Sequence, residues 1–360
     1  MSDHFIKNIE IKNFKCFKDF KAEGFGRVNL IGGKNNVGKT AFMEACYILS
    51  DVHNFLEYDL FNKLLEIQTA RNVINMLVSK TDREEDIRNL IKNNLNFEII
   101  TRFKDAEFEE KLVQSVSISL IMTDIFVHNS FGLLYDYIEC SKENLLVKFN
   151  EEQTTSTKRY KFNNLIENLN LYLTSTKVKF SRNFISSCLY SNSKIEDIVG
   201  ETKLDNKYKQ LNQYLLLAFD IESIDIIKNE PMLKIKEKYY KLSNYGEGIK
   251  NFISIIASLL ILKNKVIFID ELENGIHYTN LDQLWEIILT ISKQQNVQVF
   301  ATTHSKECIE SYARVAKKLE DEEIGFIELG RDDDNKIESI IYSYEWLIDE
   351  VSQNHEVRGW

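Results

Sequence analysis

Short blocks of apolar residues near the start of the chain predict three strands and a helix. Residues 5–11 alternate between polar and apolar, as a half-buried strand does, and a second strand is predicted near Phe20. Residues 28–31 form a short apolar third strand. Residues 41–49 have helical spacing, with one apolar face made by Phe42, Ala45, Cys46 and Leu49. The N-terminal region is therefore predicted to be a small sheet followed by a helix.

From residue 51 to about residue 219 the pattern changes repeatedly between helix and strand. Residues 51–95 are helical and strongly charged, and we interpret the charged run at 82–88 as a solvated helix face rather than a binding site. Period-two alternation predicts strands at residues 97–103, 112–124, 133–138 and 145–149. Helical spacing returns at residues 163–173 and 203–219. This block is predicted to be an insertion of mixed structure, and its residues indicate no function.

The last third of the chain contains the longest apolar runs. Residues 249–262 predict a long apolar helix, and residues 266–269 and 298–302 predict two strands. A strand that is apolar at every position is typical of a parallel sheet that is covered on both faces. The pattern of the chain therefore predicts an α/β protein.

A hairpin is predicted closer to the C-terminus, at residues 324–329 and 337–342. The stretch between its strands contains Asp332 and Asp334, a D-x-D pair of the kind that binds metal in nucleases. Asp and Asn also favour tight turns, and we interpret the pair as part of the hairpin turn.

Composition and charge narrow the class of protein. The chain has 360 residues, of which 44% are hydrophobic and 28% are charged, as in soluble globular proteins. Its single proline and few glycines leave no visible linker, so we expect one main domain with an insertion or second lobe. The formal net charge of −10 excludes a basic nucleic-acid coat, so binding of DNA or RNA would need a local basic patch.

The sequence also indicates a compartment. It contains no basic-then-apolar signal segment and no run of about 18 apolar residues, so we expect a cytoplasmic protein without a membrane span. The cysteines are scattered without a C-x-x-C pair, which argues against a disulfide framework and a zinc site. We expect buried thiols in a reducing cytosol at Cys16, Cys46, Cys140, Cys188 and Cys308.

Residues 33–40 carry the clearest chemical motif. They fit G-x-x-x-x-G-K-[ST], a loop between a strand and a helix whose backbone N–H groups surround a phosphate. Gly33 and Gly38 let the chain bend where a side chain would collide with the phosphate. Lys39 can reach the β- and γ-phosphates, and the Thr40 hydroxyl can bind Mg²⁺. The remaining loop positions are Lys34, Asn35, Asn36 and Val37.

Two carboxylates follow the apolar strand at residues 266–269. Open α/β sheets bind their ligands at this end of the strands. Asp270 can hold Mg²⁺ directly or through water, and Glu271 can polarise the water that attacks a γ-phosphate. By itself the acidic pair could equally well cap the next helix, but the phosphate loop in the same chain favours the catalytic interpretation.

Two histidines and a second helix start complete the candidates. His304 follows the strand at residues 298–302, where it can contact a γ-phosphate or the attacking water instead of being a structural histidine. His277 is compatible with either role. Small residues at 242–248 precede the helix at 249–262 and leave backbone N–H groups free for a second anion.

These features occur in a defined order: phosphate loop, glycine-containing helix start, Asp-Glu strand end, Glu-Asn-Gly-Ile-His turn and Thr-His-Ser. The order resembles the ABC-type ATPase heads of the SMC, RecF and OLD families, and above all the OLD-like ATP-binding proteins grouped as AAA-15 or AAA-21. The resemblance covers about half of the chain, at residues 6–49, residues 242–305 and the tail around Glu356-Val357-Arg358.

The resemblance implies a fold and a division into units. The fold is an α/β P-loop NTPase, an ABC-type ATPase head with an N-terminal β-subdomain and an inserted mixed α/β lobe with a helical arm. Residues 1–50 would form the N-terminal part of the head, residues 51–219 the inserted lobe, and residues 220–360 the C-terminal part of the head.

The resemblance also implies ATP and Mg²⁺ as ligands and gives roles to single residues. Gly33, Asn36, Gly38, Lys39 and Thr40 match the Walker A loop. Asp270 and Glu271 match Walker B and its catalytic glutamate, residues 273–277 match the D-loop, and His304 matches the switch histidine. The signature region, with Gly246 as its second glycine, is Ser243, Asn244, Gly246, Glu247 and Gly248.

In the family the signature closes over ATP that the partner protomer holds, so a head-to-tail homodimer or a higher homo-oligomer is implied. Here the signature is not a clean L-S-G-G-Q, and either Ser243 or Asn244 takes the place of the family serine. No Q-loop glutamine stands out, and residues 180–187 are the candidate region. The lack of long heptads argues against a true SMC protein. The stretch after Ser305 is too short for a Toprim nuclease with its own sheet.

The implied function is a nucleotide-gated switch that hydrolyses ATP as a dimer. The expected setting is bacterial DNA metabolism or anti-phage defence, together with a separate nuclease or toxin chain. The alternative is a slowly hydrolysing scaffold that uses bound ATP to organise a complex, which the irregular signature favours. A small-molecule kinase fits the Asp-Glu pair poorly, because a kinase must keep water away from the γ-phosphate.

Overall fold

A computed structural model of the protein describes residues 5–50, 97–103, 111–123, 142–151, 154–161, 184–185, 192–353 and 355. Several predicted features lie outside these residues: the helical patterns at 51–95 and 163–173, the strand at 133–138, the charged run at 82–88 and the tail motif at 356–358. Of the candidate Q-loop region at 180–187, only residues 184 and 185 are described.

A six-stranded sheet forms the centre of the molecule, in the order β15-β14-β3-β13-β12-β8. All neighbouring pairs in it are parallel except β14 and β15, which form the predicted hairpin. Its strands are β3 (Val28–Gly33), β8 (Phe184–Ile185), β12 (Val266–Ile269), β13 (Gln298–Thr302), β14 (Ile324–Arg331) and β15 (Ile337–Tyr342). The strands predicted at 266–269 and 298–302 are confirmed with the same bounds, and both are buried along their whole length.

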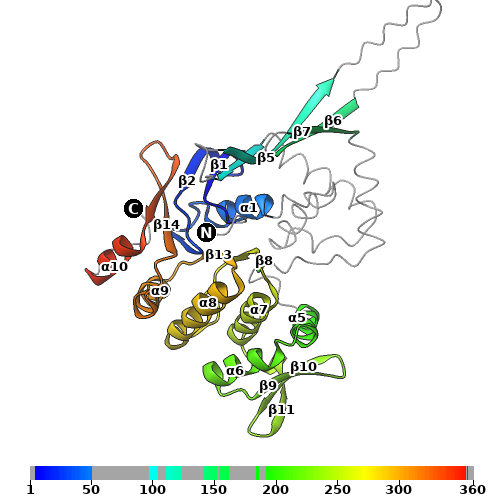
Figure 1. The fold of residues 1–360 in the computed structure, drawn as a ribbon, viewed down its shortest axis with the longest axis vertical. Coiled ribbons are helices and arrows are strands. Elements are labelled where there is room, and N and C mark those ends of the chain that lie inside the picture. Colours follow the sequence, from blue (N-terminus) through cyan, green and yellow to red (C-terminus); the bar gives the residue numbers. More distant parts are fainter. Residues whose placement is uncertain are drawn as a thin grey trace, which may run out of the picture.

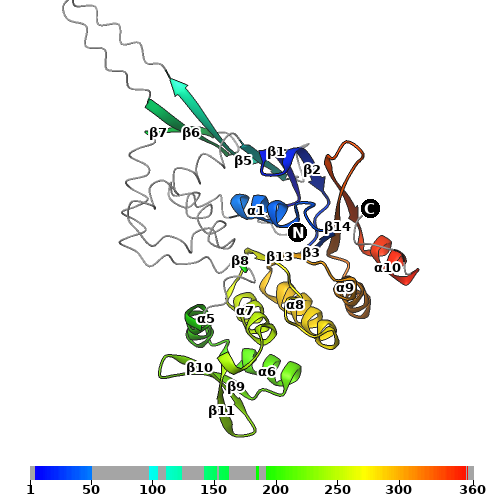
Figure 2. The ribbon, with the colours of Figure 1, turned by 180° about the vertical axis from the view of Figure 1, so that it is seen from behind.

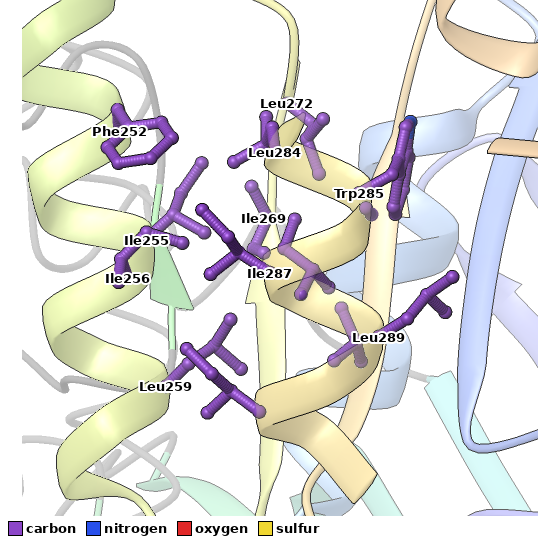
Figure 3. Close-up of a cluster of buried hydrophobic side chains, with 14 of the residues drawn as sticks. Phe252, Ile255, Ile256, Leu259, Ile269, Leu272, Leu284, Trp285, Ile287 and Leu289 are labelled. Atoms are coloured by element: carbon purple, nitrogen blue, oxygen red, sulfur yellow. The ribbon is translucent and has the colours of Figure 1, made fainter. Parts of the chain in front are cut away.

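Three helices lie side by side on one face of this sheet (Figures 1 and 2). They are α7 (Glu247–Ile261), α8 (Leu281–Gln295) and α9 (Lys306–Leu319), and the short helix α10 (Tyr344–Ser352) follows at the C-terminal end. Figure 3 shows the apolar side chains that gather between α7, α8 and β12, among them Phe252, Leu259, Ile269 and Ile287. These residues are almost completely buried, so α7 is fixed firmly against the sheet that it covers.

Helix α1 (Lys39–Leu49) covers the opposite face of the central sheet. A second six-stranded sheet lies on the other side of α1 (Figure 1). The second sheet has the order β2-β1-β4-β5-β6-β7. Its strands are β1 (Asn8–Phe14), β2 (Phe17–Glu23), β4 (Phe97–Phe103), β5 (Lys111–Thr123), β6 (Lys142–Glu151) and β7 (Thr154–Lys161). Because α1 lies between two sheets, Met43 and Tyr47 are buried as well as the predicted apolar face of Phe42, Ala45 and Cys46.

A smaller group of elements precedes α7 in the chain and packs beside it (Figure 1). It consists of α5 (Asn192–Leu204), α6 (Tyr208–Phe219), and a three-stranded sheet of β9 (Ser223–Ile227), β10 (Glu230–Ile235) and β11 (Lys238–Lys241). The sequence pattern did not predict this sheet. The helix predicted at 203–219 begins later, at Tyr208, because a turn with Asn206 in a left-handed conformation (φ 58°) separates it from α5.

Strands from the middle of the chain pair with strands from its ends. β4 lies antiparallel to β1, with Ile99 opposite Ile11, and β8 lies parallel to β12, with Ile185 opposite Ile269. The middle segment thus contributes to both large sheets, and the division of the chain at residues 50 and 219 stays a prediction.

Two of the cysteines are buried as expected, Cys46 and Cys308, and burial raises the pKa of both thiols. The prediction is wrong for Cys16, which is exposed because it lies in the turn between β1 and β2. Cys140 and Cys188 lie outside the described residues. None of the described helices has both the length and the apolar character that crossing a bilayer requires.

Candidate nucleotide-binding site

The predicted site residues meet because the parallel strands that carry them are neighbours. β13 lies between β3 and β12, and the pairing places Ile31 beside Thr302 and Ile269 beside Ala301. The C-terminal ends of all three strands therefore reach the same edge of the sheet, where open α/β sheets bind ligands. The segments that leave this edge are the Walker A loop, the Asp270-Glu271 turn and the segment of Thr303 and His304.

The Walker A loop needs glycine at two positions. Gly33 has a φ of 138°, and a Cβ atom there would lie 2.4 Å from the carbonyl oxygen of Leu329 on β14. Gly38 has a φ of 95°, and its Cβ would lie 2.8 Å from the sulfur of Cys16. Both positions thus combine a left-handed backbone with a close neighbour. Between the two glycines, Val37 is buried. The exposed residues of the loop are Lys34, Asn35 and Asn36.

Lys39 is buried and folds back over this loop. Its Nζ atom donates hydrogen bonds to the carbonyl oxygens of Gly33 and Lys34, both at 2.7 Å. Burial lowers the pKa of Lys39 to about 8, although the charges of Asp270, Glu273 and Glu271 act in the opposite direction. The lysine of Walker A therefore lies within electrostatic reach of the carboxylates at the end of β12.

Asp270 receives two hydroxyl groups on one carboxylate oxygen. Thr40 donates to its Oδ1 atom at 3.2 Å, and Thr302 donates to the same atom at 2.6 Å. Thr302 also accepts a hydrogen bond from the backbone N–H of Glu271 at 2.8 Å. The structure thus joins both predicted metal ligands, and it adds Thr302, which was not among the predicted site residues. The signal was its position as the last residue of a buried strand.

Thr40 and Asp270 fit a Mg²⁺ site of the P-loop type. Mg²⁺ usually keeps several waters and takes few protein oxygens together with those of the substrate phosphates. Among the described residues there is no group of three or more His, Cys, Asp or Glu side chains that could hold a metal ion without such help. The two side chains would hold the ion, and the ion would neutralise charge on the β- and γ-phosphates.

Glu271 occupies an uncommon backbone conformation. Its φ is 52°, in the left-handed region that residues with a side chain seldom adopt. Hydrogen bonds on either side hold this turn: Asp270 N–H donates to Ile185 at 2.8 Å, and Leu272 N–H donates to Thr302 at 3.0 Å. Strain of this kind is common where a side chain must point in one direction for function.

His304 is exposed at the end of β13, and a carboxylate from the Walker B turn holds its backbone. Its N–H donates to Oε1 of Glu273 at 2.8 Å. The next residue, Ser305, caps α9 by accepting the N–H of Cys308 at 3.1 Å. Glu273 was expected only as part of the D-loop region. Its link to His304 depends on the pairing of β12 with β13, which the sequence does not reveal.

The signature region packs against the D-loop. Gly246 is the N-cap of α7, and a Cβ on Gly248 would lie only 1.9 Å from the carbonyl oxygen of Gly275. Asn251 donates to the carbonyl oxygens of Leu272 and Asn274, at 3.0 and 3.1 Å. Three other signature candidates are exposed: Ser243, Asn244 and Glu247. The last of them pairs with Lys250 at 2.7 Å.

Two remaining candidates have local structural roles. His277 is exposed and caps the turn before α8, where its Nδ1 atom lies 2.9 Å from the hydroxyl of Thr279. Asp332 accepts the backbone N–H of Lys336 at 2.7 Å, so the interpretation of the D-x-D pair as a hairpin turn is confirmed. The same hairpin reaches the Walker A loop, because Arg331 donates to the carbonyl oxygen of Asn36 at 3.1 Å.

Comparisons with known proteins agree with this geometry. The family described as AAA_15, AAA ATPase domain, matches residues 5–309. An "ATP/GTP phosphatase" of Helicobacter pylori is 28% identical over 331 residues, which cover 87% of this chain and 89% of that protein.

Solved structures of two SMC heads are similar over most of the chain. One, bound to the C-winged helix domain of ScpA, has 14% identity and a TM-score of 0.49, covering 94% of this chain and 98% of its own. The other, from Thermotoga maritima, has 12% identity and a TM-score of 0.44, covering 93% and 98%. Since the family match spans well over half of its residues, the chain belongs to the AAA_15 family of AAA ATPase domains.

Proposed function

We propose that the protein hydrolyses ATP at the end of the central sheet. The Walker A loop binds the phosphates, and Lys39 exchanges its two carbonyl partners for phosphate oxygens. Glu271 removes a proton from a water molecule, and the water oxygen bonds to the γ-phosphorus. The bond between that phosphorus and the bridging oxygen breaks, so that ADP and phosphate leave. His304 contacts the γ-phosphate and reports whether it is present.

The observation that supports this proposal best is the hydrogen-bonded series of Thr40, Asp270, Thr302 and Glu271. It joins a Walker A side chain to the predicted general base through contacts of 3.2, 2.6 and 2.8 Å. A general base must be held in place before the reaction, because misplacement by about 1 Å can reduce a rate a hundredfold. The name of the Helicobacter pylori relative also supports nucleoside triphosphate hydrolysis, so GTP should be tested beside ATP.

The proposed working form is a head-to-tail homodimer in the cytoplasm, in which the signature of one protomer closes over ATP on the other. Gly246 supports this proposal. Its φ of −64° is ordinary and a Cβ atom would meet nothing within 4 Å, so the fold of one chain does not require glycine there. A partner's phosphate that approaches the backbone closely would require it.

The proposed setting rests on the resemblance to SMC, RecF and OLD proteins. It is bacterial DNA metabolism or anti-phage defence, in which the nucleotide state controls a separate nuclease or toxin chain and nucleic acid is a possible ligand. The alternative is a scaffold that retains ATP and hydrolyses it slowly, which the irregular signature at Ser243 and Asn244 favours. Phosphate release under steady-state conditions, with and without DNA, separates the two proposals.

Two substitutions test the proposed chemistry. Lys39→Ala should abolish ATP binding, because it removes the charge that faces the phosphates. Glu271→Gln should bind ATP as the parent does and reduce hydrolysis by at least about a hundredfold, because the general base is lost. Binding is measured with a fluorescent ATP analogue and hydrolysis by phosphate release. Hydrolysis by Glu271→Gln at the parent rate would contradict the proposal.

Gly246→Ala tests the proposed dimer separately. We expect it to keep the parent melting temperature and the parent affinity for ATP as a monomer, since the added methyl group has space in the single chain. Because Glu271→Gln should retain ATP, we expect this variant to form a dimer when ATP is present. The dimer should disappear when Gly246→Ala is added. Mass measured by light scattering with ATP and Mg²⁺ shows the result, and an unchanged dimer would exclude this role of Gly246.

A further inference from the structure

Glu273 joins the Walker B turn to the segment that carries His304. It lies three residues after Asp270 in a tight turn, where Asn274 N–H donates to Glu271 and Ile276 N–H donates to Glu273, both at 2.9 Å. From this turn its Oε1 atom accepts the N–H of His304 at 2.8 Å. A hydrogen bond to a carboxylate is stronger than one between neutral groups, so the position of His304 depends on Glu273.

The second oxygen of the same carboxylate is buried and unsatisfied. Oε2 of Glu273 has no hydrogen-bond partner among the residues that the structure describes. A buried acceptor left in this state destabilises a protein, and a charged one does so more strongly. Such groups call for an explanation, and one explanation is a ligand that donates a hydrogen bond to this oxygen when the site is filled.

The charge of Glu273 also acts on the phosphate-binding side of the site. It is the second largest of the influences that raise the pKa of Lys39, after Asp270 and before Glu271. The charge of Glu273 therefore acts on Lys39 in the same direction as the charges of Asp270 and Glu271. Glu273 follows the two Walker B acids in the same turn, and the match to the D-loop gives its carboxylate no role of its own.

We propose that Glu273 is a positioning residue of the hydrolytic site: Oε1 fixes the backbone of His304, and Oε2 accepts a hydrogen bond from the water that Glu271 activates. Two acceptors then define the direction of the attacking oxygen, with Glu271 taking the proton and Glu273 holding the water in line. The inference rests on the proposed function and adds a second carboxylate to it.

The amide of glutamine separates the two contacts of Glu273. In Glu273→Gln the side-chain carbonyl can still accept the His304 N–H, but an NH₂ group replaces Oε2 and cannot accept a hydrogen bond from water. We expect kcat for ATP to fall at least about tenfold, the effect of losing one strong hydrogen bond at the reacting centre. The affinity for ATP with Mg²⁺ and the melting temperature should match those of the parent protein.

Glu273→Ala tests the contact with His304 through a double-mutant cycle. Both contacts are lost, so kcat should fall further than in the glutamine variant. In a chain that also carries His304→Ala, the additional loss from Glu273→Ala should be clearly smaller, because part of its effect acts through that histidine. Glu310→Gln is the matched control: it makes the same chemical change in α9, where Glu310 pairs with Lys306 at 3.6 Å.

The outcomes separate this inference from the proposed function. If Glu273→Gln hydrolyses ATP at the parent rate while Glu271→Gln is inactive, the inference is wrong and the proposed function stands. If Glu273→Ala lowers kcat by the same factor in the parent protein and in His304→Ala, Glu273 does not act through His304 and the inference is also wrong. If Glu271→Gln itself keeps the parent rate, the proposed function fails and the inference fails with it.

Discussion

Thr302 uses its hydroxyl in both directions. The hydroxyl has one proton, which it donates to Asp270, and lone pairs, one of which accepts the N–H of Glu271. A single buried side chain thus fixes both Asp270, the proposed metal ligand, and the backbone of Glu271, the proposed general base. Groups behind the ligands are often nearly as important as the ligands themselves, because they hold them in the productive orientation.

This geometry predicts a specific defect in Thr302→Val. Valine has almost the same shape but lacks the hydroxyl that accepts the N–H of Glu271 and donates to Asp270. Losing both hydrogen bonds is an unfavourable change of about 1–3 kcal/mol. We expect ATP hydrolysis to fall by about tenfold or more and a higher concentration of Mg²⁺ to be needed for half-maximal rate. Thr302→Ser keeps the hydroxyl and should remain close to the parent. Equal rates in the valine and serine variants would mean that the hydroxyl does not matter.

Residues were predictable from the sequence where a motif fixes their spacing. Lys39 and Thr40 follow from eight consecutive positions, and Asp270 from its place after an apolar strand. The contributions of Thr302 and Glu273 were not predictable, because they arise from the register of β13 beside β12. Two strands that are separated by a helix in the chain do not show this register in their residues.

At the scale of elements, α7 and the D-loop form one unit. Gly248 and Gly275 allow their backbones to touch, since the Cβ that Gly248 lacks would lie 1.9 Å from a carbonyl oxygen. Asn251, one turn further along α7, donates to two carbonyl oxygens of the Walker B turn. A displacement of the signature helix would therefore move the turn that carries Glu273. This turn connects the proposed dimer contact to the proposed catalytic residues.

Gly248→Ala should push α7 and the D-loop apart. The methyl group collides with backbone, which cannot rotate away, so we expect a loss of about 1–3 kcal/mol in the free energy of unfolding and a reduced rate of hydrolysis. Gly200→Ala is the control, because it lies inside α5 with nothing within 4 Å of the added atom. There alanine should stabilise the helix by about 0.5–1 kcal/mol. Urea denaturation measures both, and equal midpoints would contradict the proposed contact.

The elements that the sequence predicted best are those with continuous apolar runs, such as β12, β13 and α7. The small sheet of β9, β10 and β11 was missed because its strands are short, with four to six residues each. One of its turns consists of Lys236 and Glu237, with φ values of 48° and 65°. A tight hairpin turn needs such angles, but the residues that predict it in a sequence are Asn and Gly, not Lys and Glu.

At the scale of the whole molecule, the fold depends on contacts between the two ends of the chain. β3, from the N-terminal part, lies between β13 and β14 of the C-terminal part. Gln298 adds to this connection: its side chain accepts the N–H of Ile6 at 2.8 Å and donates to the carbonyl oxygens of Ile6 and Gly26 at 2.8 and 2.9 Å. The order of the motifs indicated one shared core, whereas the neighbours of each strand could be found only from the structure.

Arg27, at the start of β3, is the clearest case of such a long-range contact. Its side chain is 3% exposed, forms a buried ion pair with Asp321, and donates to Glu323 and to the carbonyl oxygen of Leu289, both at 3.2 Å. Arg27→Met would leave Asp321 charged and buried without this partner. Removing one member of a buried pair typically destabilises a protein by about 3–5 kcal/mol, and we expect a loss of this size.

The matched control is Arg314→Met, which removes an exposed ion pair between Arg314 and Asp282 on the surface of α9 and α8. Because water screens this pair, we expect a change of at most about 1 kcal/mol. Adding Asp321→Leu to Arg27→Met should recover most of the lost stability, since the unpaired charge disappears while the apolar surroundings remain. Urea denaturation of the four proteins measures these differences. If Arg27→Met and Arg314→Met unfold at the same urea concentration, the buried pair does not hold the two ends of the chain together.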